Sequence, residues 1–316
     1  MKITIAICTW NRSRLLRQTL ESIEQTRRPT ALDWQVVVVD NNSTDDTRTV
    51  VDTFLDRMPV KYVLETQQGH AVSRNTAIAN ATGDYIIWTD NDTIVDPGWL
   101  QAYASAFEQN PEAAFFGGPI IPVFEKGKPD WLDATWKKCK GVYAERDLGD
   151  EKIELGSGIF PYGANFAIRT ETQKQFLYDT ADGRKGSQMV GDDEIRVLRS
   201  VWAAGNRGYW IPAASLQHVI PDDRATTKYI GRYFVGQGIT NVRLEKVDKT
   251  SSTAWREAMA CQFKWRLKRY LSEPEEWVSH LIRANLSWGE YLAIRSQTGS
   301  ENSSRASGNN GSAEAS

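Results

Sequence analysis

The chain has 316 residues, of which 41% are hydrophobic and 25% are charged, and this composition is typical of a soluble globular protein with one large domain or two modest ones. Its net charge of −2 argues against a general nucleic-acid binder. The N-terminus lacks the layout of a signal peptide, and no apolar stretch reaches the roughly 18 residues of a membrane span. Because Cys8, Cys139 and Cys261 lie far apart, we expect free thiols in a cytoplasmic protein.

The first half of the chain alternates predicted strands and helices. Short apolar or β-branched runs predict strands at residues 2–9, 36–39, 60–64 and 85–88. Helical patterns lie between them, at residues 13–25, at a segment ending at residue 54, and at residues 71–80. This alternation predicts an α/β fold with a mostly parallel sheet that is covered on both faces.

The second half is less regular. We expect elements at residues 97–109 (helix), 114–122 (strand), 164–169 (strand), 193–204 (helix) and 207–211 (the last strand, which His218 follows). Residues 225–296 show helical patterns only, and the stretch after residue 299 lacks large apolar residues. The predicted organisation is an α/β domain over residues 1–220, a helical region over residues 221–298 and a disordered tail over residues 299–316.

Polar side chains gather near the ends of the first strands. They are Thr9, Asn11, Arg12, Asp40, Arg74, Asp90, Asn91 and Asp92, of which Arg74 belongs to the helix before the fourth strand. The carboxyl ends of parallel strands meet at one edge of a sheet, where ligands of open α/β folds bind. Carboxylates and guanidinium groups there suit a nucleoside diphosphate whose phosphates are bridged by Mg²⁺ or Mn²⁺. Each position alone is also explained by turn chemistry, so it is the set that favours a ligand site.

Several common nucleotide and hydrolase motifs are missing from the sequence. No Gly-x-Gly-x-x-Gly follows the first strand, and neither Gly-x-x-x-x-Gly-Lys-Ser/Thr nor Gly-x-Ser-x-Gly occurs. These absences argue against a dinucleotide-binding enzyme, a P-loop NTPase and an α/β-hydrolase.

The ordered set of motifs resembles family 2 glycosyltransferases of the GT-A fold, of the type that assembles bacterial polysaccharides. The matching segments are residues 7–12, 38–45, 69–75, 90–92, 163–169 and 191–195. The resemblance extends from about Lys2 to His218, with a departure at Asn41, where the family often has a second Asp. It implies a GT-A fold with a mostly parallel central sheet and added C-terminal helices. It also implies an inverting, metal-dependent enzyme that moves a sugar from a nucleoside-diphosphate sugar, expected to be a UDP-sugar.

The same resemblance implies roles for the residues at the sheet edge. Thr9, Asp40 and Arg74 would hold the base and ribose of the donor nucleotide, and Asn11, Arg12 and Asn91 belong to the same donor site. Asp90 and Asp92 would form the motif that binds Mn²⁺ or Mg²⁺, with Asp92 as the direct ligand. His218 would approach the same ion.

A second acidic pair begins the helix predicted from residue 193. By resemblance, Asp193 is the base that deprotonates the acceptor hydroxyl, and Asp192 is either the alternative base or a contact to the acceptor. Carboxylates also stabilise the start of a helix through its dipole, which is the structural alternative for both residues.

The C-terminal region contains a basic amphipathic helix. Apolar residues recur at every fourth position and basic residues lie between them: Trp255, Met259, Phe263, Leu267 and Leu271 alternate with Arg256, Lys264, Arg266, Lys268 and Arg269. Such a helix either packs on the preceding domain or lies on a membrane rich in anionic lipid. The second alternative suits a lipid-linked rather than a free glycan acceptor, and it predicts a peripheral position at the inner face of the membrane.

Two other functions are compatible with parts of the pattern. A sugar nucleotidyltransferase shares the α/β layout, but it usually has a Gly-rich loop with Lys or Arg after the first strand, which residues 10–13 lack. A non-catalytic protein that binds a nucleotide or a sugar would not need both acidic sites.

Overall fold

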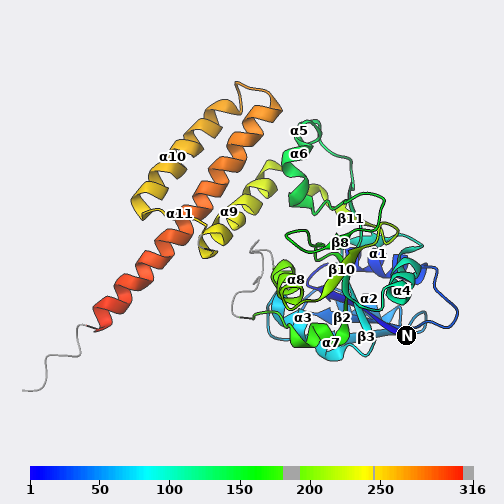
Figure 1. Ribbon diagram of the computed structural model, residues 1–316. Coiled ribbons are helices and arrows are strands. Elements are labelled where there is room, and N and C mark those ends of the chain that lie inside the picture. The colour runs from blue at the N-terminus through cyan, green and yellow to red at the C-terminus, as the bar shows by residue number, and fades with distance from the viewer. Residues whose placement is uncertain (181–192, 245, 309–316) are drawn as a thin grey trace, which may run out of the picture. The chain divides into compact units, whose positions relative to one another are not determined.

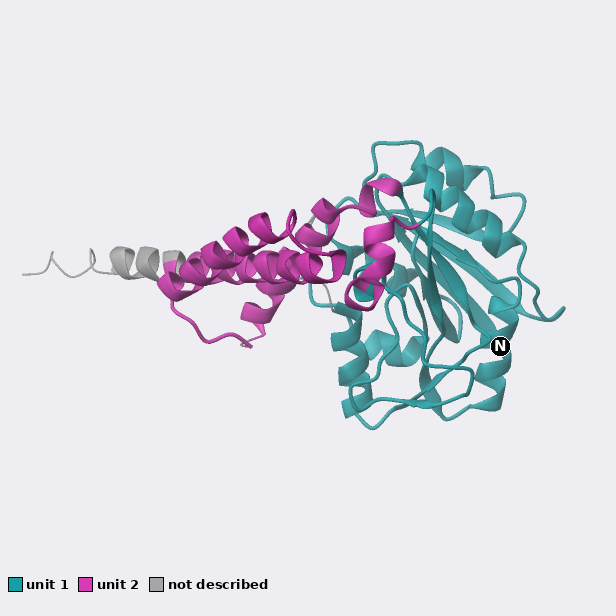
Figure 2. Ribbon diagram, turned by 90° about the horizontal axis from the view of Figure 1, so that it is seen from above, with its two compact units in different colours: residues 1–127, 140–187, 192–221 teal, residues 128–139, 188–191, 222–316 magenta. Residues whose placement is uncertain are grey.

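The computed structural model describes residues 1–180, 193–244 and 246–308, which fall into two compact units (Figures 1 and 2). Unit 1 contains Met1–Gly127 and the described parts of Lys140–Ser187 and Asp192–Pro221. Unit 2 contains Lys128–Cys139 and the described part of Asp222–Ser316.

Unit 1 is built on a mixed sheet of eight strands in the described residues, in the order β3-β2-β1-β4-β9-β6-β10-β8. The strands β3, β2, β1 and β4 pair in parallel, whereas β9 runs antiparallel between β4 and β6. Their bounds are β1 (Lys2–Thr9), β2 (Asp33–Asp40), β3 (Val60–Leu64), β4 (Tyr85–Thr89), β6 (Ala113–Gly117), β8 (Glu154–Leu155), β9 (Asn165–Arg169) and β10 (Arg207–Trp210). The predicted mostly parallel sheet is therefore confirmed, with two antiparallel strands, β9 inside the sheet and β8 at its edge.

Helices cover both faces of this sheet (Figure 1). Successive side chains of a strand point to opposite faces, so Ile5 and Ile7 pack in one apolar cluster with α1, α2 and α4, while Ala6 packs in another with α3 and α8. The helices of unit 1 are α1 (Ser13–Glu24), α2 (Thr47–Asp52), α3 (His70–Asn80), α4 (Trp99–Gln109), α7 (Thr170–Gln175) and α8 (Asp193–Ala203), with a 3₁₀ turn η1 (Lys140–Tyr143). This two-sided burial explains the uniformly apolar run in β2.

Unit 1 also has a second, small sheet, around which the structure differs from two of the sequence predictions. Within the described residues it has the order β5 (Thr93–Val95), β11 (Leu216–Ile220) and β7 (Ile120–Phe124). The strand expected at residues 114–122 is split into β6 and β7, and Gly118 between them lies so close to the Ala214 carbonyl that a side chain there would collide with it. His218 was expected after the last strand but lies within β11, which pairs with β5 and β7.

Unit 2 is a helical unit in which α9 (Thr227–Arg243) and α10 (Ser251–Lys268) pack against α11 (Pro274–Gly308). Gly238 of α9 and Gly289 of α11 face backbone atoms of the opposite helix so closely that any side chain would clash. Glycine at these positions lets the two helices approach. The 3₁₀ turn η2 (Asp222–Arg224) precedes α9.

Unit 2 also contains a segment from the middle of the chain. The segment 128–139 belongs to unit 2 and contains α5 (Asp130–Ala134) and α6 (Trp136–Cys139). The ring centres of Trp131 and Trp277 lie 5.5 Å apart, and Lys138 Nζ donates to the Ser279 hydroxyl at 2.6 Å. The helix α11 is described up to Gly308.

None of the helices in the described ranges combines the length and the apolar character that crossing a membrane requires. The cysteines Cys8, Cys139 and Cys261 all lie in these ranges and are free.

A buried charge network in unit 2 gives a stability prediction. Lys249 Nζ lies 2.6 Å from Glu257 Oε2 and 3.0 Å from Glu290 Oε2, and the Glu290 side chain is only 6% exposed. Lys249→Met leaves this buried carboxylate without its lysine, so we expect the free energy of unfolding to fall by about 2 kcal/mol. Urea unfolding followed by circular dichroism measures the change. The double variant Lys249→Met/Glu290→Gln should recover part of it, and an unchanged single variant would contradict this account.

Candidate functional site

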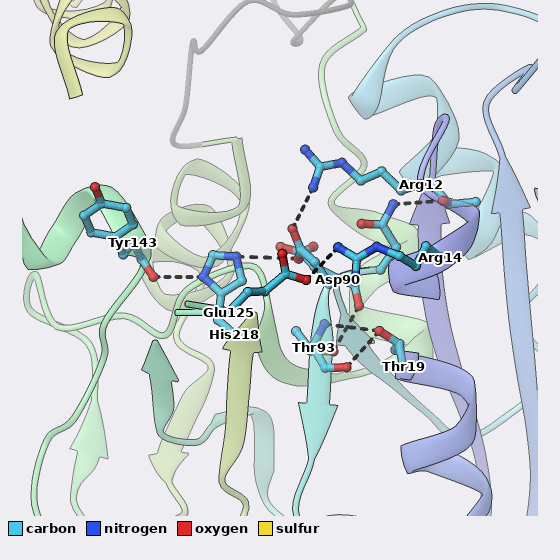
Figure 3. Close-up of polar contacts among 11 residues, drawn as sticks. Arg12, Arg14, Thr19, Asp90, Thr93, Glu125, Tyr143 and His218 are labelled. Carbon is cyan, nitrogen blue, oxygen red and sulfur yellow. Dashed lines mark hydrogen bonds and ion pairs between the residues drawn. The ribbon is translucent and has the colours of Figure 1, made fainter. Parts of the chain in front are cut away.

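The acidic turn Asp90–Asp92 lies at the carboxyl end of β4 and leads directly into β5. It is fixed to α1 by two hydrogen bonds, in which the Thr93 amide donates to the Thr19 hydroxyl (3.1 Å) and that hydroxyl donates to the Thr93 carbonyl (2.8 Å). Figure 3 shows these bonds below the turn. The turn is therefore held at the sheet edge before any ligand binds.

Asp92 is a buried carboxylate with two partners from distant parts of the chain. Its side chain is 6% exposed, Arg12 Nη1 lies 3.1 Å from its Oδ2, and His218 Nε2 lies 3.5 Å from its Oδ1. Arg12 comes from the loop after β1 and His218 from β11, and both point toward the acidic turn in Figure 3. A buried carboxylate requires such compensation, because removing its charge from water is costly.

The hydrogen bond made by Nδ1 of His218 determines what its other ring nitrogen, Nε2, can bind. His218 Nδ1 is 2.9 Å from the backbone carbonyl of Tyr143, and because a carbonyl only accepts hydrogen bonds, Nδ1 carries the proton. In a neutral imidazole, Nε2 then directs its lone pair at the Asp92 carboxylate. Two electron-rich atoms are stable in that arrangement only when Nε2 is protonated or when both atoms bind a cation. A backbone carbonyl on the far nitrogen is typical of metal-ligating histidines.

Asp90 adds a further carboxyl group beside Asp92. Burial, followed by the neighbouring Asp92, raises the pKa of Asp90, while Arg74 and His218 oppose this rise. Within the part of the chain that the structure describes, no group of three or more His, Cys, Asp or Glu side chains is arranged so that it could hold a metal ion. Mg²⁺ and Mn²⁺ commonly take only one or two protein ligands and complete their coordination with waters and substrate phosphates, so the few ligand atoms at this turn suit an ion that binds together with a diphosphate.

Arg74 is a buried cation on α3, near the turn. Its Nη1 donates to the Tyr178 hydroxyl (2.9 Å) and its Nε to His70 Nε2 (3.3 Å), and the side chain is almost fully enclosed. Burial alone lowers the pKa of Arg74, but the interactions with Tyr178 and Glu194 outweigh it and raise the pKa above its usual value. The site therefore contains a permanent positive charge that is already oriented.

Asp40 ends β2 next to Thr9, its pairing partner on β1. One carboxylate oxygen of Asp40 accepts from the Ser43 amide (2.9 Å) and the other from the Tyr62 hydroxyl (2.7 Å). Burial, and then the hydrogen bond to Asp40, raise the pKa of Tyr62 to about 12, so Tyr62 remains a donor. Each carboxylate oxygen has a further lone pair, which leaves Asp40 able to accept from a ligand.

Asn41 departs from the family pattern for a structural reason. Its side-chain oxygen accepts from the Gly69 amide (2.9 Å), and its side-chain nitrogen donates to the carbonyls of Gln67 (2.8 Å) and Glu65 (3.3 Å). A carboxylate has no proton to donate to these two carbonyls. Asn41 therefore connects the end of β2 to the loop before α3.

Asn91 and Asn11 connect the neighbouring strand ends. The Asn91 side-chain nitrogen donates to the Thr9 hydroxyl at 2.8 Å, and both residues are buried. Asn11 has a φ of 50°, accepts from the Thr44 amide (2.7 Å) and donates its own amide to Ser43 (2.9 Å). Asn11 thus joins the loops after β1 and β2, which explains an Asn in a left-handed conformation there.

The second acidic pair is described in part. Asp193 begins α8, whereas Asp192 lies outside the described residues. The next residue, Glu194, accepts from the Gly163 amide (3.3 Å) and interacts electrostatically with Arg74, so the start of α8 lies close to the site. Asp193 itself lines an open pocket of about 130 Å³, together with Phe176, Leu177, Asp179, Arg196, Val197 and Ser200.

Four residues of this site were not identified by the sequence prediction. Tyr62, Tyr143 and Tyr178 orient Asp40, His218 and Arg74 through tertiary contacts that leave no local pattern. Glu194 could have been found, because it follows directly on the acidic pair in the sequence.

Comparison with known proteins identifies the family. A model described as glycosyl transferase family 2 matches residues 4–170. The chain belongs to glycosyl transferase family 2. It is 30% identical over 227 residues to the glucosyl-dolichyl phosphate glucuronosyltransferase of Haloferax volcanii, covering 69% of each protein. It is 24% identical over 268 residues to the succinoglycan biosynthesis protein ExoM of Rhizobium meliloti, covering 82% of this chain and 81% of that protein.

The fold agrees with this assignment. A structure of the mannosyltransferase PcManGT from Pyrobaculum calidifontis, in complex with GDP-Man and Mn²⁺, is similar with a TM-score of 0.59 and 18% identity, covering 92% of this chain and 86% of that one. The predicted GT-A fold and family are thus confirmed. The protein is a glycosyltransferase that takes its sugar from a nucleotide-sugar donor, and the alternatives of a nucleotidyltransferase and a non-catalytic binding protein are set aside.

Asn165, in the family segment 163–169, gives a second stability prediction. Its side-chain oxygen accepts from Trp99 and Tyr103 (2.9 Å each), and its nitrogen donates to the carbonyls of Pro119 (2.9 Å) and Ala214 (2.7 Å). Asn165→Ala removes all four bonds and leaves the Trp99, Tyr103 and Ala214 groups without these partners, while the Pro119 carbonyl still accepts from the Leu216 amide (3.1 Å), so we expect the free energy of unfolding to fall by about 3–5 kcal/mol. Denaturant unfolding measures it. Asn165→Asp keeps the acceptor but sets a second oxygen without a proton against the two carbonyls, so it should be destabilised as well, and an unchanged stability of either variant would contradict the assignment.

Proposed function

We propose that the protein transfers a sugar, with inversion, from a UDP-sugar to a hydroxyl of a glycan or lipid-linked acceptor during polysaccharide biosynthesis. The observation that carries this proposal is the position of Asp92, which lies between Arg12 and Nε2 of His218 in a family 2 glycosyltransferase. Asp92 and His218, with Asp90 beside them, would hold Mn²⁺ or Mg²⁺. When bound, this ion would supply positive charge to the diphosphate leaving group.

The residues around the turn account for donor binding. Asp40 and Thr9 lie side by side at the ends of β2 and β1 and offer oxygen atoms to the base N–H groups and ribose hydroxyls of a nucleotide. Arg74 is fixed by Tyr178 and remains charged, which suits a base carbonyl or a phosphate. The Arg12 side chain is 33% exposed and can move from Asp92 to a phosphate oxygen when a metal ion occupies its place.

The start of α8 supports the role of a base. Inversion requires a group on the face opposite the leaving group that accepts the proton of the attacking hydroxyl. Asp193 begins α8 and lines an open pocket, while the neighbouring Glu194 faces Arg74. We assign the base to Asp193 and keep Asp192 as the alternative or as an acceptor contact.

The relatives support the acceptor class. One is named for a reaction on glucosyl-dolichyl phosphate, a sugar linked to a lipid, and the other for the biosynthesis of a polysaccharide, succinoglycan. A lipid-linked saccharide fits both names, and it is the acceptor that we propose.

Nucleotide binding tests the donor site directly. We expect one of UDP, GDP, dTDP and CDP, with UDP as the predicted one, to raise the melting temperature of the purified protein only when Mn²⁺ is present. At a concentration about 100 times Kd, the stabilisation should be about 2.7 kcal/mol. Asp92→Asn should abolish the metal-dependent part, whereas Asp56→Asn, a change at an exposed carboxylate of the same unit, should not. A shift that is independent of Mn²⁺ and unchanged in Asp92→Asn would refute the metal assignment.

Turnover tests the base. Asp193→Asn should lower kcat by about 10²–10⁴-fold, because an amide cannot accept the proton, while leaving nucleotide binding intact. Sugar transfer is measured with the donor identified above and a lipid-linked saccharide. Asp179→Asn, at the same pocket, is the matched control and should retain most of the activity. Full activity of Asp193→Asn together with inactive Asp192→Asn would move the assignment to Asp192.

A further inference from the structure

The end of α10 and the turn after it carry apolar side chains that the rest of unit 2 leaves exposed. Phe263, Leu267, Tyr270 and Leu271 are 71%, 50%, 76% and 69% exposed, and they form what we call the apolar ridge. Apolar stripes of surface helices normally face the protein interior. Phe263, Leu267 and Leu271 belong to the apolar stripe predicted from the sequence, and within unit 2 the structure leaves them exposed.

The orientation of α10 in unit 2 explains this exposure. The face of α10 that is buried contains Ala254 and Ala258, which are 2% and 0% exposed. Small side chains allow α10 to lie close to α11. Because residues 258 and 263 are five positions apart, Phe263 projects from the side of α10 opposite to Ala258, and Leu267 follows it one turn later. The packing of unit 2 itself therefore turns the ridge outward.

Basic side chains accompany the ridge. Lys264, Arg266 and Arg269 are exposed, and no Asp or Glu occurs in the sequence between Glu257 and Glu273. The Arg269 guanidinium lies 4.6 Å from the centre of the Tyr270 ring, so positive charge is placed directly beside an exposed aromatic residue. Lys268 differs from these three, because it pairs with Glu276 at 2.7 Å.

We propose that the apolar ridge inserts into the interface of a bilayer containing anionic lipid, with Lys264, Arg266 and Arg269 contacting the headgroups. Exposed aromatic and aliphatic residues flanked by Lys and Arg are the features that place a helix at a membrane surface. A symmetric dimer through the ridge is disfavoured, because the same surface would meet itself and bring like charges together. This proposal rests on α10 and its turn alone, and it goes beyond the proposed reaction by locating the enzyme at the surface that holds lipid-linked sugars.

Vesicle sedimentation of the full chain tests the proposal. We expect binding to vesicles made of equal parts phosphatidylcholine and phosphatidylglycerol, weak binding to phosphatidylcholine alone, and a loss of binding as salt is raised. Lys264→Gln/Arg266→Gln/Arg269→Gln should weaken binding about 100-fold. Phe263→Ser/Leu267→Ser should also weaken it strongly, because inserted apolar area is lost. All of these positions are exposed, so the variants should melt as the parent does.

Matched controls separate this surface from general charge and from catalysis. Lys228→Gln/Arg232→Gln/Arg243→Gln removes the same charge from exposed positions of α9 and should bind vesicles as the parent does. Asp92→Asn should also bind normally, which separates failure of this proposal from failure of the donor site. Equal loss in the α9 control, or no binding of the parent, would overturn the proposal. Self-association that Phe263→Ser/Leu267→Ser abolishes, without vesicle binding, would instead identify the ridge as a protein contact.

Discussion

The buried carboxylate of Asp92 is the constraint on which the arrangement of the site depends. A charge at the end of a strand inside an α/β domain must be compensated, and here the compensation comes from Arg12 and His218. The small sheet serves this purpose, because β5 continues directly from the acidic turn and β11 pairs with it, with His218 opposite Thr93. The proximity of Asp92 and His218 is therefore a product of strand pairing, and the backbone carbonyl of Tyr143 behind His218 fixes which ring nitrogen carries the proton in the neutral form.

Local signals in the sequence were sufficient for the first half of the fold. The strands β1 to β4 are short, apolar and separated by helical patterns, so their order and parallel pairing followed from general rules. The same rules predicted that Thr9, Asp40 and Asp90 would share one edge, because parallel strands end on the same side of a sheet. The sequence therefore predicted those parts of the site that are formed by residues at strand ends.

Tertiary contacts determine the remainder, and the sequence pattern does not encode them locally. The strand β11 is short and contains Gln217 and His218, so it lacked an apolar pattern. Tyr178 reaches Arg74 across 104 positions of the chain, and the segment 128–139 joins unit 2 through Trp131 and Trp277. At Asn41 the sequence did show a departure from the family pattern, but only the tertiary structure explains it. The carbonyls of Glu65 and Gln67 accept hydrogen bonds from the Asn41 side chain, which a carboxylate could not donate.

The helix α10 shows why amphipathic character alone does not decide what a helix contacts. The sequence left two alternatives open, because an apolar stripe can face either a protein core or a lipid surface. Within unit 2 the contact with α11 is made by the face that carries Ala254 and Ala258, so the larger apolar residues of α10 cannot serve that contact. Exposure of Phe263 and Leu271 to water lowers the solubility of the protein, so these side chains need a contact surface. Their basic neighbours, among which no Asp or Glu occurs, favour an anionic surface over an apolar protein interior as that contact. The helix thus combines a small-residue face for its own unit with a large-residue face suited to the membrane that would hold the acceptor.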